Sequence, residues 1–155
     1  MGLISLMDLA IELEKKIGDC YVRMSGMATD KGLQKELMKL SQEETGHASL
    51  LKTGKNFAAK NPEFFSQGGM DLKLLENCLS GINELLDKLG LGTITLQAAL
   101  GRIVALEYFC EKAHMANLVH FEEPSLKPLF EGLARDDAEH GERVFQLLQK
   151  HHSLV

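Results

Sequence analysis

The apolar positions of this chain follow a helical period. Apolar residues recur three and four positions apart in five segments, whereas no segment alternates apolar and polar residues as a half-buried strand does. Only three prolines, at Pro62, Pro124 and Pro128, interrupt the pattern. The pattern therefore predicts an all-α protein, with helices over about residues 5–28, 31–52, 70–89, 93–119 and 125–150.

The lengths of the connections indicate how these helices are arranged. A short turn at residues 29–32 makes the first two helices antiparallel neighbours, and Pro124 suits the start of the last helix. The connection over residues 53–92 is too long to lack secondary structure, and its helix would span about 28 Å, enough to cross a bundle from end to end. Two helical hairpins joined by one long crossover predict a ferritin-like four-helix bundle, which we expect to form a single domain over residues 1–155.

Each predicted bundle helix carries one acid in its otherwise apolar, core-facing stripe. The four acids are Glu14, Glu44, Glu107 and Asp137. In two helices a histidine follows its acid by three positions, which gives the pairs Glu44/His47 and Asp137/His140. Four carboxylates in one core would each be costly to desolvate and would repel one another. No Lys or Arg lies in these stripes near the acids, so protonation or bound metal must relieve the charge.

The spacing of these residues indicates an internal duplication. An offset of 93 residues places Glu14 on Glu107, Glu44 on Asp137 and His47 on His140. In an antiparallel hairpin, facing residues lie equally far from the turn, and the midpoint of each acid pair falls in a predicted turn, at residues 29 and 122. We therefore expect the four carboxylates to meet at one level of the bundle.

The donor set favours a dinuclear metal site. Two divalent ions would balance four carboxylates, and carboxylate oxygen with imidazole nitrogen suits iron or manganese, with zinc as a further candidate. One Glu from each of two helices, plus an acid-x-x-His motif from each of the other two, is the ligand pattern of di-iron and di-manganese bundles.

Four segments of the chain resemble the four helices of rubrerythrin-like proteins. They are AIELE at 10–14 with Tyr21 following, SQEETGH at 41–47, LGRIVALE at 100–107 and LARDDAEH at 133–140. The resemblance implies that Glu14 and Glu107 are single-Glu ligands, that Glu44 and Asp137 bridge two ions, and that His47 and His140 are terminal ligands. It also implies that the Tyr21 hydroxyl hydrogen-bonds a ligand carboxylate; the alternative is a tyrosine that belongs simply to the core.

The chain departs from the family pattern in three respects. Asp137 replaces the usual Glu and is one methylene shorter, which affects its reach as a bridge. Cys110 occupies the place of an additional carboxylate, and Glu111, one position further, is a weak substitute. The sequence contains no rubredoxin domain, so electrons would come from a separate donor such as a rubredoxin.

Two further residues are candidates for supporting roles. His114 lies two turns, about 10 Å, beyond Glu107, which predicts a residue that contacts a ligand or a plain core histidine rather than a member of the same ligand shell. Cys110 is either a redox-active thiol or inert packing. We expect His120, His151 and His152 to be solvated.

The function implied by the resemblance is a redox enzyme. Its two iron ions would reduce hydrogen peroxide or dioxygen with electrons from the external donor, and the family implies a homodimer. A ferroxidase that handles iron is the alternative within metal chemistry, and a hydroxylase of an organic or nucleic-acid substrate is a further one. A helical scaffold without metal is the alternative from another class.

Charge and composition restrict the remaining classes. The chain has 17 basic and 22 acidic residues, a net charge of −5, and no basic run, which disfavours a nucleic-acid partner. Its three cysteines form no C-x-x-C pair, so they indicate reduced thiols and a cytoplasmic protein rather than a disulfide framework. No apolar stretch approaches the ~20 residues of a membrane span, so we expect no membrane partner.

Overall fold

The computed structural model describes residues 2–64, 72–116 and 126–151, and these residues are predominantly helical. No strand occurs within these ranges, so the predicted all-α class is confirmed. A 3-10 turn, η1 (Pro62–Phe64), follows the second helix. The helices are α1 (Leu3–Met27), α2 (Lys31–Lys60), α3 (Lys73–Leu91), α4 (Leu96–Ala116) and α5 (Leu126–His151).

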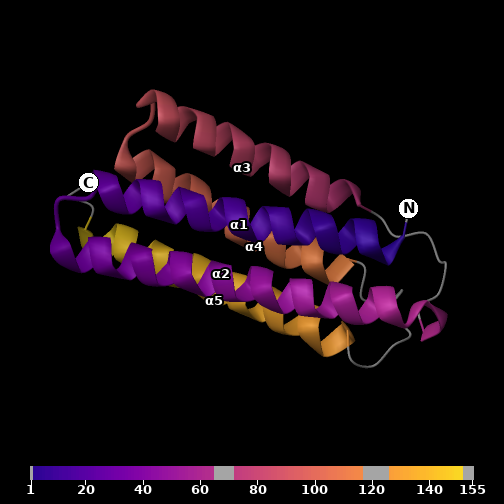
Figure 1. Cartoon of the computed structure of the whole chain (residues 1–155). Helices are drawn as coiled ribbons and strands as arrows, with labels where there is room; N and C mark the ends of the chain where they lie inside the picture. The colour runs from indigo at the N-terminus through magenta and orange to yellow at the C-terminus, as the bar shows by residue number, and fades with distance from the viewer. Residues whose placement is uncertain (1, 65–71, 117–125, 152–155) are drawn as a thin grey trace.

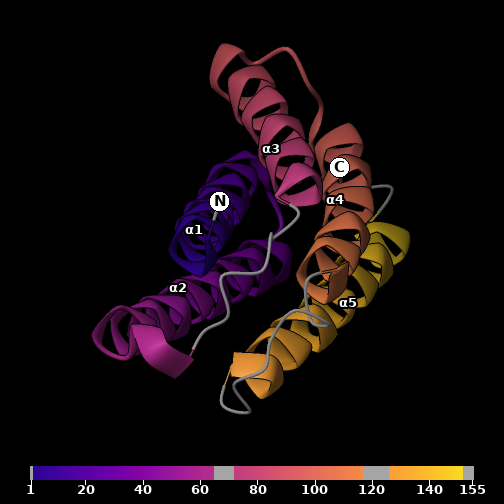
Figure 2. The same cartoon turned by 90° about the vertical axis from the view of Figure 1, so that its right-hand side faces the viewer.

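The helices run side by side, each antiparallel to the one before it in the chain (Figure 1). α1 packs on α2, α4 packs on α5, and the two hairpins meet through α2 with α5 and α1 with α4. The crossover helix α3 lies along α1 and α4 on the side away from α2 and α5 (Figure 2). The interior of the bundle is therefore enclosed by α1, α2, α4 and α5, and α3 covers one side of it.

Local sequence signals explain three of the helix ends. The side chain of Asp30 accepts a hydrogen bond from the backbone N–H of Leu33 at 2.8 Å, which caps α2. Gly92 ends α3 in the left-handed region with φ 66°, a conformation that glycine adopts without steric cost. The hydroxyl of Thr95 accepts from the backbone N–H of Ala98 at 3.2 Å, so α4 begins at residue 96 rather than at 93.

The predicted end of the second helix, at about residue 52, is wrong, because α2 continues to Lys60. Gly54, just beyond the predicted end, provides space within the helix. A Cβ at Gly54 would lie 2.9 Å from Met7 Cε and 3.0 Å from Leu129 Cδ2. This glycine therefore lets α1 and α5 pack closely against an uninterrupted α2.

The other predicted boundaries agree with the structure where it describes them. α1 and α5 begin or end within two residues of the expected positions, and α3 begins at Lys73 and ends at Leu91. The predicted start of the crossover helix at Met70, the end of the third bundle helix at 119 and the turn with Pro124 lie outside the described residues.

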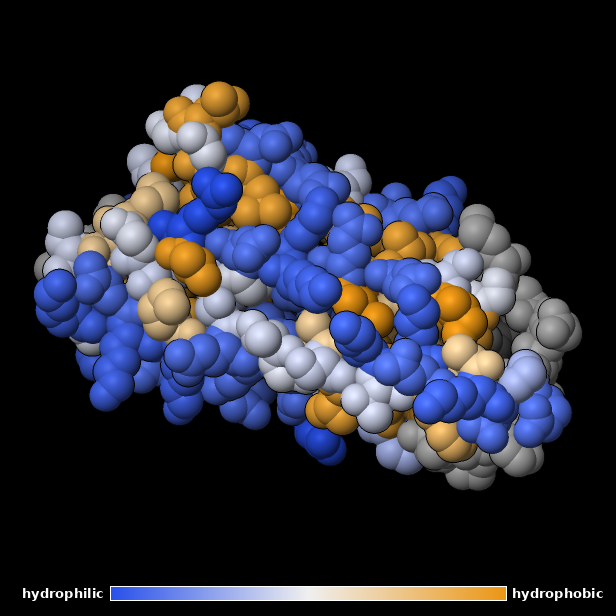
Figure 3. All heavy atoms as spheres, viewed as in Figure 1, coloured by the Kyte–Doolittle hydropathy of each residue, from blue (hydrophilic) through white to orange (hydrophobic). Residues whose placement is uncertain are grey.

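The core is formed by the predicted apolar stripes. Large side chains such as Leu13, Ile17, Leu40 and Phe130 are fully buried and contribute most of the hydrophobic stabilisation. On the face shown in Figure 3, hydrophilic residues predominate and hydrophobic residues form separate areas. Among the described residues, no helix is both long enough and apolar enough to cross a membrane.

Candidate metal centre

The structure brings the six predicted ligands together in the interior of the bundle. Glu14 comes from α1, Glu44 and His47 from α2, Glu107 from α4, and Asp137 and His140 from α5. The four carboxylate residues are 0% exposed, and the two histidines are buried. Apolar residues one turn away on each helix exclude water from this cluster, which we call the acid–histidine cluster.

Glu44 lies at the centre of the contacts between α2 and α5. His140 Nδ1 is 2.6 Å from Glu44 Oε1, and His47 Nδ1 is 3.2 Å from Glu44 Oε2 and 3.2 Å from Glu14 Oε2. The two imidazole rings stack with centroids 5.3 Å apart. Both Nδ1 atoms thus face the carboxylates, and each could bind either a proton or a metal ion.

Tyr21 and His114 make equivalent contacts across the bundle. The Tyr21 hydroxyl donates to Glu107 Oε1 at 2.5 Å, so it contacts a predicted ligand carboxylate. His114 Nε2 lies 2.9 Å from Glu14 Oε1. The offset of 93 residues relates Tyr21 to His114 and Glu14 to Glu107, so each residue contacts the carboxylate of the opposite hairpin.

His114 lies closer to the cluster than its sequence position suggested. The expected separation of about 10 Å was measured along α4 from Glu107, but the carboxylates of α1 and α5 reach the level of His114. Its Nε2 is 3.3 Å from Asp137 Oδ2 as well as 2.9 Å from Glu14. His114 is therefore in direct contact with two predicted ligands.

Two acids that the sequence analysis did not single out hold the histidines from the outside. His47 Nε2 is 3.2 Å from Asp136 Oδ2, and His140 Nε2 is 2.9 Å from Glu43 Oε2. Arg143 in turn donates to Glu43 Oε2 at 2.6 Å. The signal was present in the sequence, because an acid directly precedes both Glu44 and Asp137. Such outer carboxylates orient metal-binding imidazoles in other proteins.

Several oxygens in the cluster have no hydrogen-bond partner. Both oxygens of Asp137 and the Oε2 atom of Glu107 are buried without one among the described residues. Asp137 also belongs to both groups whose donor atoms lie within 4.8 Å of one another, Glu44/His47/Asp137/His140 and Glu14/His114/Asp137. Because unpartnered buried carboxylate oxygens are rare, these residues fit a metal ion well.

Without metal, protons compensate the charge of the cluster. Burial lowers the pKa of His47, but hydrogen bonds to Glu14 and Glu44 outweigh it and raise that pKa to about 11. Burial would raise the pKa of Glu14, yet His114 and His47 hold it well below its usual value. Burial and the charge of neighbouring carboxylates raise the pKa of three other acids, Glu44, Glu107 and Asp137.

Glu111 and Cys110 do not join the acid–histidine cluster. Glu111 is half-buried and lies beside the exposed Tyr108. Loss of solvent around the hydroxyl, and then the charges of Glu142 and Glu111, raise the pKa of Tyr108. Cys110 is fully buried next to Cys78 of α3. His151, expected to be solvated, is 8% exposed, because the last turn of α5 packs near Asp30 of the α1–α2 turn. His120 and His152 lie outside the described residues.

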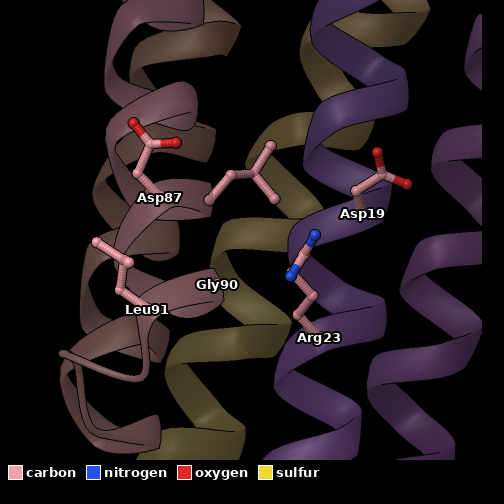
Figure 4. Close-up of a pocket in the computed structure, with 6 residues that line it drawn as sticks. Asp19, Arg23, Asp87, Gly90 and Leu91 are labelled. Carbon is pink, nitrogen blue, oxygen red and sulfur yellow. The ribbon is translucent and has the colours of Figure 1, made fainter.

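Two surface pockets differ in their relation to the cluster. A pocket of about 460 Å³ between α1 and α3 is lined by charged residues such as Asp19, Arg23 and Asp87, none of which belongs to the cluster (Figure 4). A pocket of about 390 Å³ between α2 and α5 is lined by His47 and Asp136. The second pocket therefore reaches the wall of the cluster from the surface.

No family model matches the chain, and no curated protein and no solved structure matches it. The chemistry of the cluster is therefore the basis for a functional proposal.

Proposed function

We propose that this protein is a ferritin-like, di-metal oxidoreductase that reduces hydrogen peroxide or dioxygen. The observation that carries the proposal is Asp137. Its two buried oxygens have no hydrogen-bond partner, yet they lie between two groups of potential ligands. A carboxylate in this position is costly for a structural bundle, whereas it suits a residue that bridges two cations.

The residues divide naturally between two ions. Glu44, His47 and His140 would hold one ion, Glu14 and His114 would hold the other, and Asp137 would contact both. Glu107, with its free Oε2 atom, is available to either ion. The mixture of carboxylate and imidazole donors favours iron, and manganese or zinc are the other candidates.

When bound, a pair of iron ions supplies two one-electron steps and polarises an O–O bond. The protein's own contribution is to orient the donors and exclude water. Asp136 and Glu43 fix the rings of His47 and His140 from outside, and Tyr21 holds Glu107 through its hydroxyl. The pocket between α2 and α5 offers small reactants a route to His47.

The likeness to rubrerythrin-like proteins supports the same function and adds its partners. By that likeness, an external donor such as a rubredoxin supplies electrons, and the protein works as a homodimer. The likeness and the geometry both concern the same acids and histidines of the four helices.

The test is anaerobic iron loading followed by rapid mixing with peroxide and with oxygen. We expect about two ions per chain and a faster reaction with peroxide. His140→Ala should remove both properties, while His151→Ala, a substitution of the same type on the same helix, should retain them. A chain that binds no iron would instead be a scaffold, and a reaction as fast with oxygen as with peroxide would favour a ferroxidase.

A further inference from the structure

The crossover helix places a second cysteine against Cys110. Cys78 on α3 and Cys110 on α4 are both 0% exposed. The acid–histidine cluster makes no use of either thiol. Each lies in the apolar core, where a single cysteine would ordinarily be inert packing.

Contacts between α3 and α4 establish that the two cysteines face each other. Arg102 donates to Glu84 at 3.1 Å. The next contact lies three residues before Glu84 on α3 and four residues after Arg102 on α4. There, a Cβ at Gly81 would lie 2.7 Å from Leu106 Cδ2. Because the two helices are antiparallel, the same step leads next to Cys78 and Cys110 (Figure 1). The thiols therefore form the third rung of one continuous contact between the helices.

The helices approach closely at this point. Gly81 has no side chain where Leu106 packs, so α3 and α4 come nearer than two larger residues would allow. A disulfide needs Cα atoms within about 7 Å of each other, and such an approach favours it. The thiol of Cys78, then burial, raise the pKa of Cys110, so the Cys110 sulfur stays protonated and resists stray electrophiles.

The pair also borders the acid–histidine cluster. Cys110 follows Glu107 by one helical turn on α4. Asp137 and Glu107 contribute to the raised pKa of Cys110, and Cys78 contributes to that of Asp137, so charge on each group acts on the other. The two thiols thus lie near enough to Asp137, the carboxylate common to both groups of potential ligands, for its charge to act on them.

Cys20 on α1 is too far away to compete. α1 and α3 are parallel, and Lys16 donates to Asn83 at 2.6 Å, which places Cys78 level with residue 11 of α1 (Figure 1). Cys20 lies nine residues further along, about 13 Å at ~1.5 Å per residue. It is buried like the other two cysteines and so provides a matched control.

We propose that Cys78 and Cys110 are a redox-active dithiol that closes to a disulfide between α3 and α4 and supplies two electrons to the metal centre. The electron transfer rests on the proposed function; the disulfide itself does not. Two S–H bonds break, one S–S bond forms, and each of two ferric ions takes up one electron. The two protons released equal those consumed when one hydrogen peroxide becomes two waters. The external donor then restores the dithiol.

The disulfide is tested on metal-free protein, refolded in glutathione buffers of graded ratio so that access to the buried thiols is not limiting. Acid quenching, alkylation and mass spectrometry then identify the linked peptides. We expect a peptide pair joined through Cys78 and Cys110, with Cys20 alkylated throughout. Alkylation of Cys78 and Cys110 at every ratio, or a bond that involves Cys20, would overturn the proposal.

Electron transfer is tested by titrating iron-loaded, fully reduced protein with peroxide in the absence of any other reductant. The wild type and Cys20→Ser should consume about two equivalents per chain, and Cys78→Ser and Cys110→Ser about one. Cys78→Ala and a melting curve check that the substitutions preserve the fold. Equal consumption by all variants would refute the electron transfer alone, whereas no consumption by any of them would refute the proposed function and leave the disulfide result standing.

Discussion

The two helical hairpins, α1–α2 and α4–α5, contribute matching residues to the interior but exchange their contacts. Tyr21 of the first hairpin donates to Glu107 of the second, and His114 of the second contacts Glu14 of the first. The outer acids follow the same rule, because Asp136 lies on His47 and Glu43 on His140. Neither hairpin completes a set of contacts alone, so the cluster exists only where the hairpins meet.

The hairpins differ at Glu44 and Asp137, the acids of their acid-x-x-His motifs. Glu44 contacts both His47 and His140, whereas both oxygens of Asp137 lack a hydrogen-bond partner. The side chain of Asp137 is one methylene shorter than that of Glu44. Two imidazoles therefore satisfy Glu44 in this structure, whereas Asp137 would gain hydrogen-bond-strength partners from a bound cation.

The largest expected effect is that of Glu44→Ala. It removes the carboxylate that contacts both imidazoles, so metal content should fall from about two ions per chain to less than one. Gln42→Ala, on an exposed position of the same helix, is the control. Elemental analysis after gel filtration measures both variants, and an unchanged metal content in Glu44→Ala would mean that Glu44 is not a ligand.

The second prediction concerns pH and includes the acid of each acid-x-x-His motif. Burial first, and then the charge of Glu14, raise the pKa of Glu44 and of Asp137, so both acids bind protons more tightly than free carboxyl groups do. Metal requires the ionised forms, so binding releases these protons. The apparent affinity should rise at least about 100-fold per pH unit over the range in which both acids are protonated, because His47, with a pKa of about 11, also gives up a proton to bind metal. Competition titrations with a chelator measure this slope.

The same shifts determine the stability of the metal-free protein. A carboxyl group whose pKa is higher in the folded than in the unfolded protein stabilises the fold less as the pH increases. Its contribution is lost between the unfolded pKa and the folded pKa. A histidine with a raised pKa, such as His47, loses its contribution as the pH approaches about 11. The melting temperature without metal should therefore fall from about pH 6 to about pH 9, and a rise would contradict the assigned protonation.

The third prediction compares the outer acids. Glu43→Gln and Asp136→Asn each remove a carboxylate that orients an imidazole, so metal affinity should fall about 10- to 100-fold. The larger loss is expected for Glu43→Gln, because Arg143 holds Glu43 at 2.6 Å and would lose its closest charged partner. Isothermal titration gives both affinities, and equal losses would show that the arginine adds no order.

The smallest expected effect is that of Asp137→Glu, which restores the missing methylene and makes the hairpins alike. A longer side chain reaches further between the two groups of donors, so metal affinity should increase about tenfold if reach limits the bridge. Overpacking should lower the metal-free stability by about 1–3 kcal/mol. An affinity that decreases would indicate that the space around Asp137 is matched to the shorter acid.

The fold could be predicted in large part because helical periodicity is local. The spacing of leucines and the scarcity of proline predicted the helices. Asp30 caps the start of α2 and Gly92 ends α3, for reasons that are visible in the sequence. The end of α2 could not be predicted this way. Gly54 looks like a helix end until the side chains of Met7 and Leu129, remote in sequence, occupy the space beside it.

The candidate site was predictable to the level of its acids and histidines. Duplicated spacing indicated which residues face the interior, and the structure brings Glu14, Glu44, Glu107 and Asp137 together. The contact of His114 with Glu14 was not predictable from distances along α4. It depends on how far side chains from other helices extend toward it.

The sequence by itself therefore determined which residues face the interior, because a helix of 3.6 residues per turn assigns each position to a side. Only the tertiary structure decided which interior residues meet. The rotation and height of each helix place His47 on Asp136, leave the oxygens of Asp137 without a hydrogen bond, and bring Cys78 to Cys110. These relations arise from packing between helices that are remote in sequence, and no period within one helix contains them.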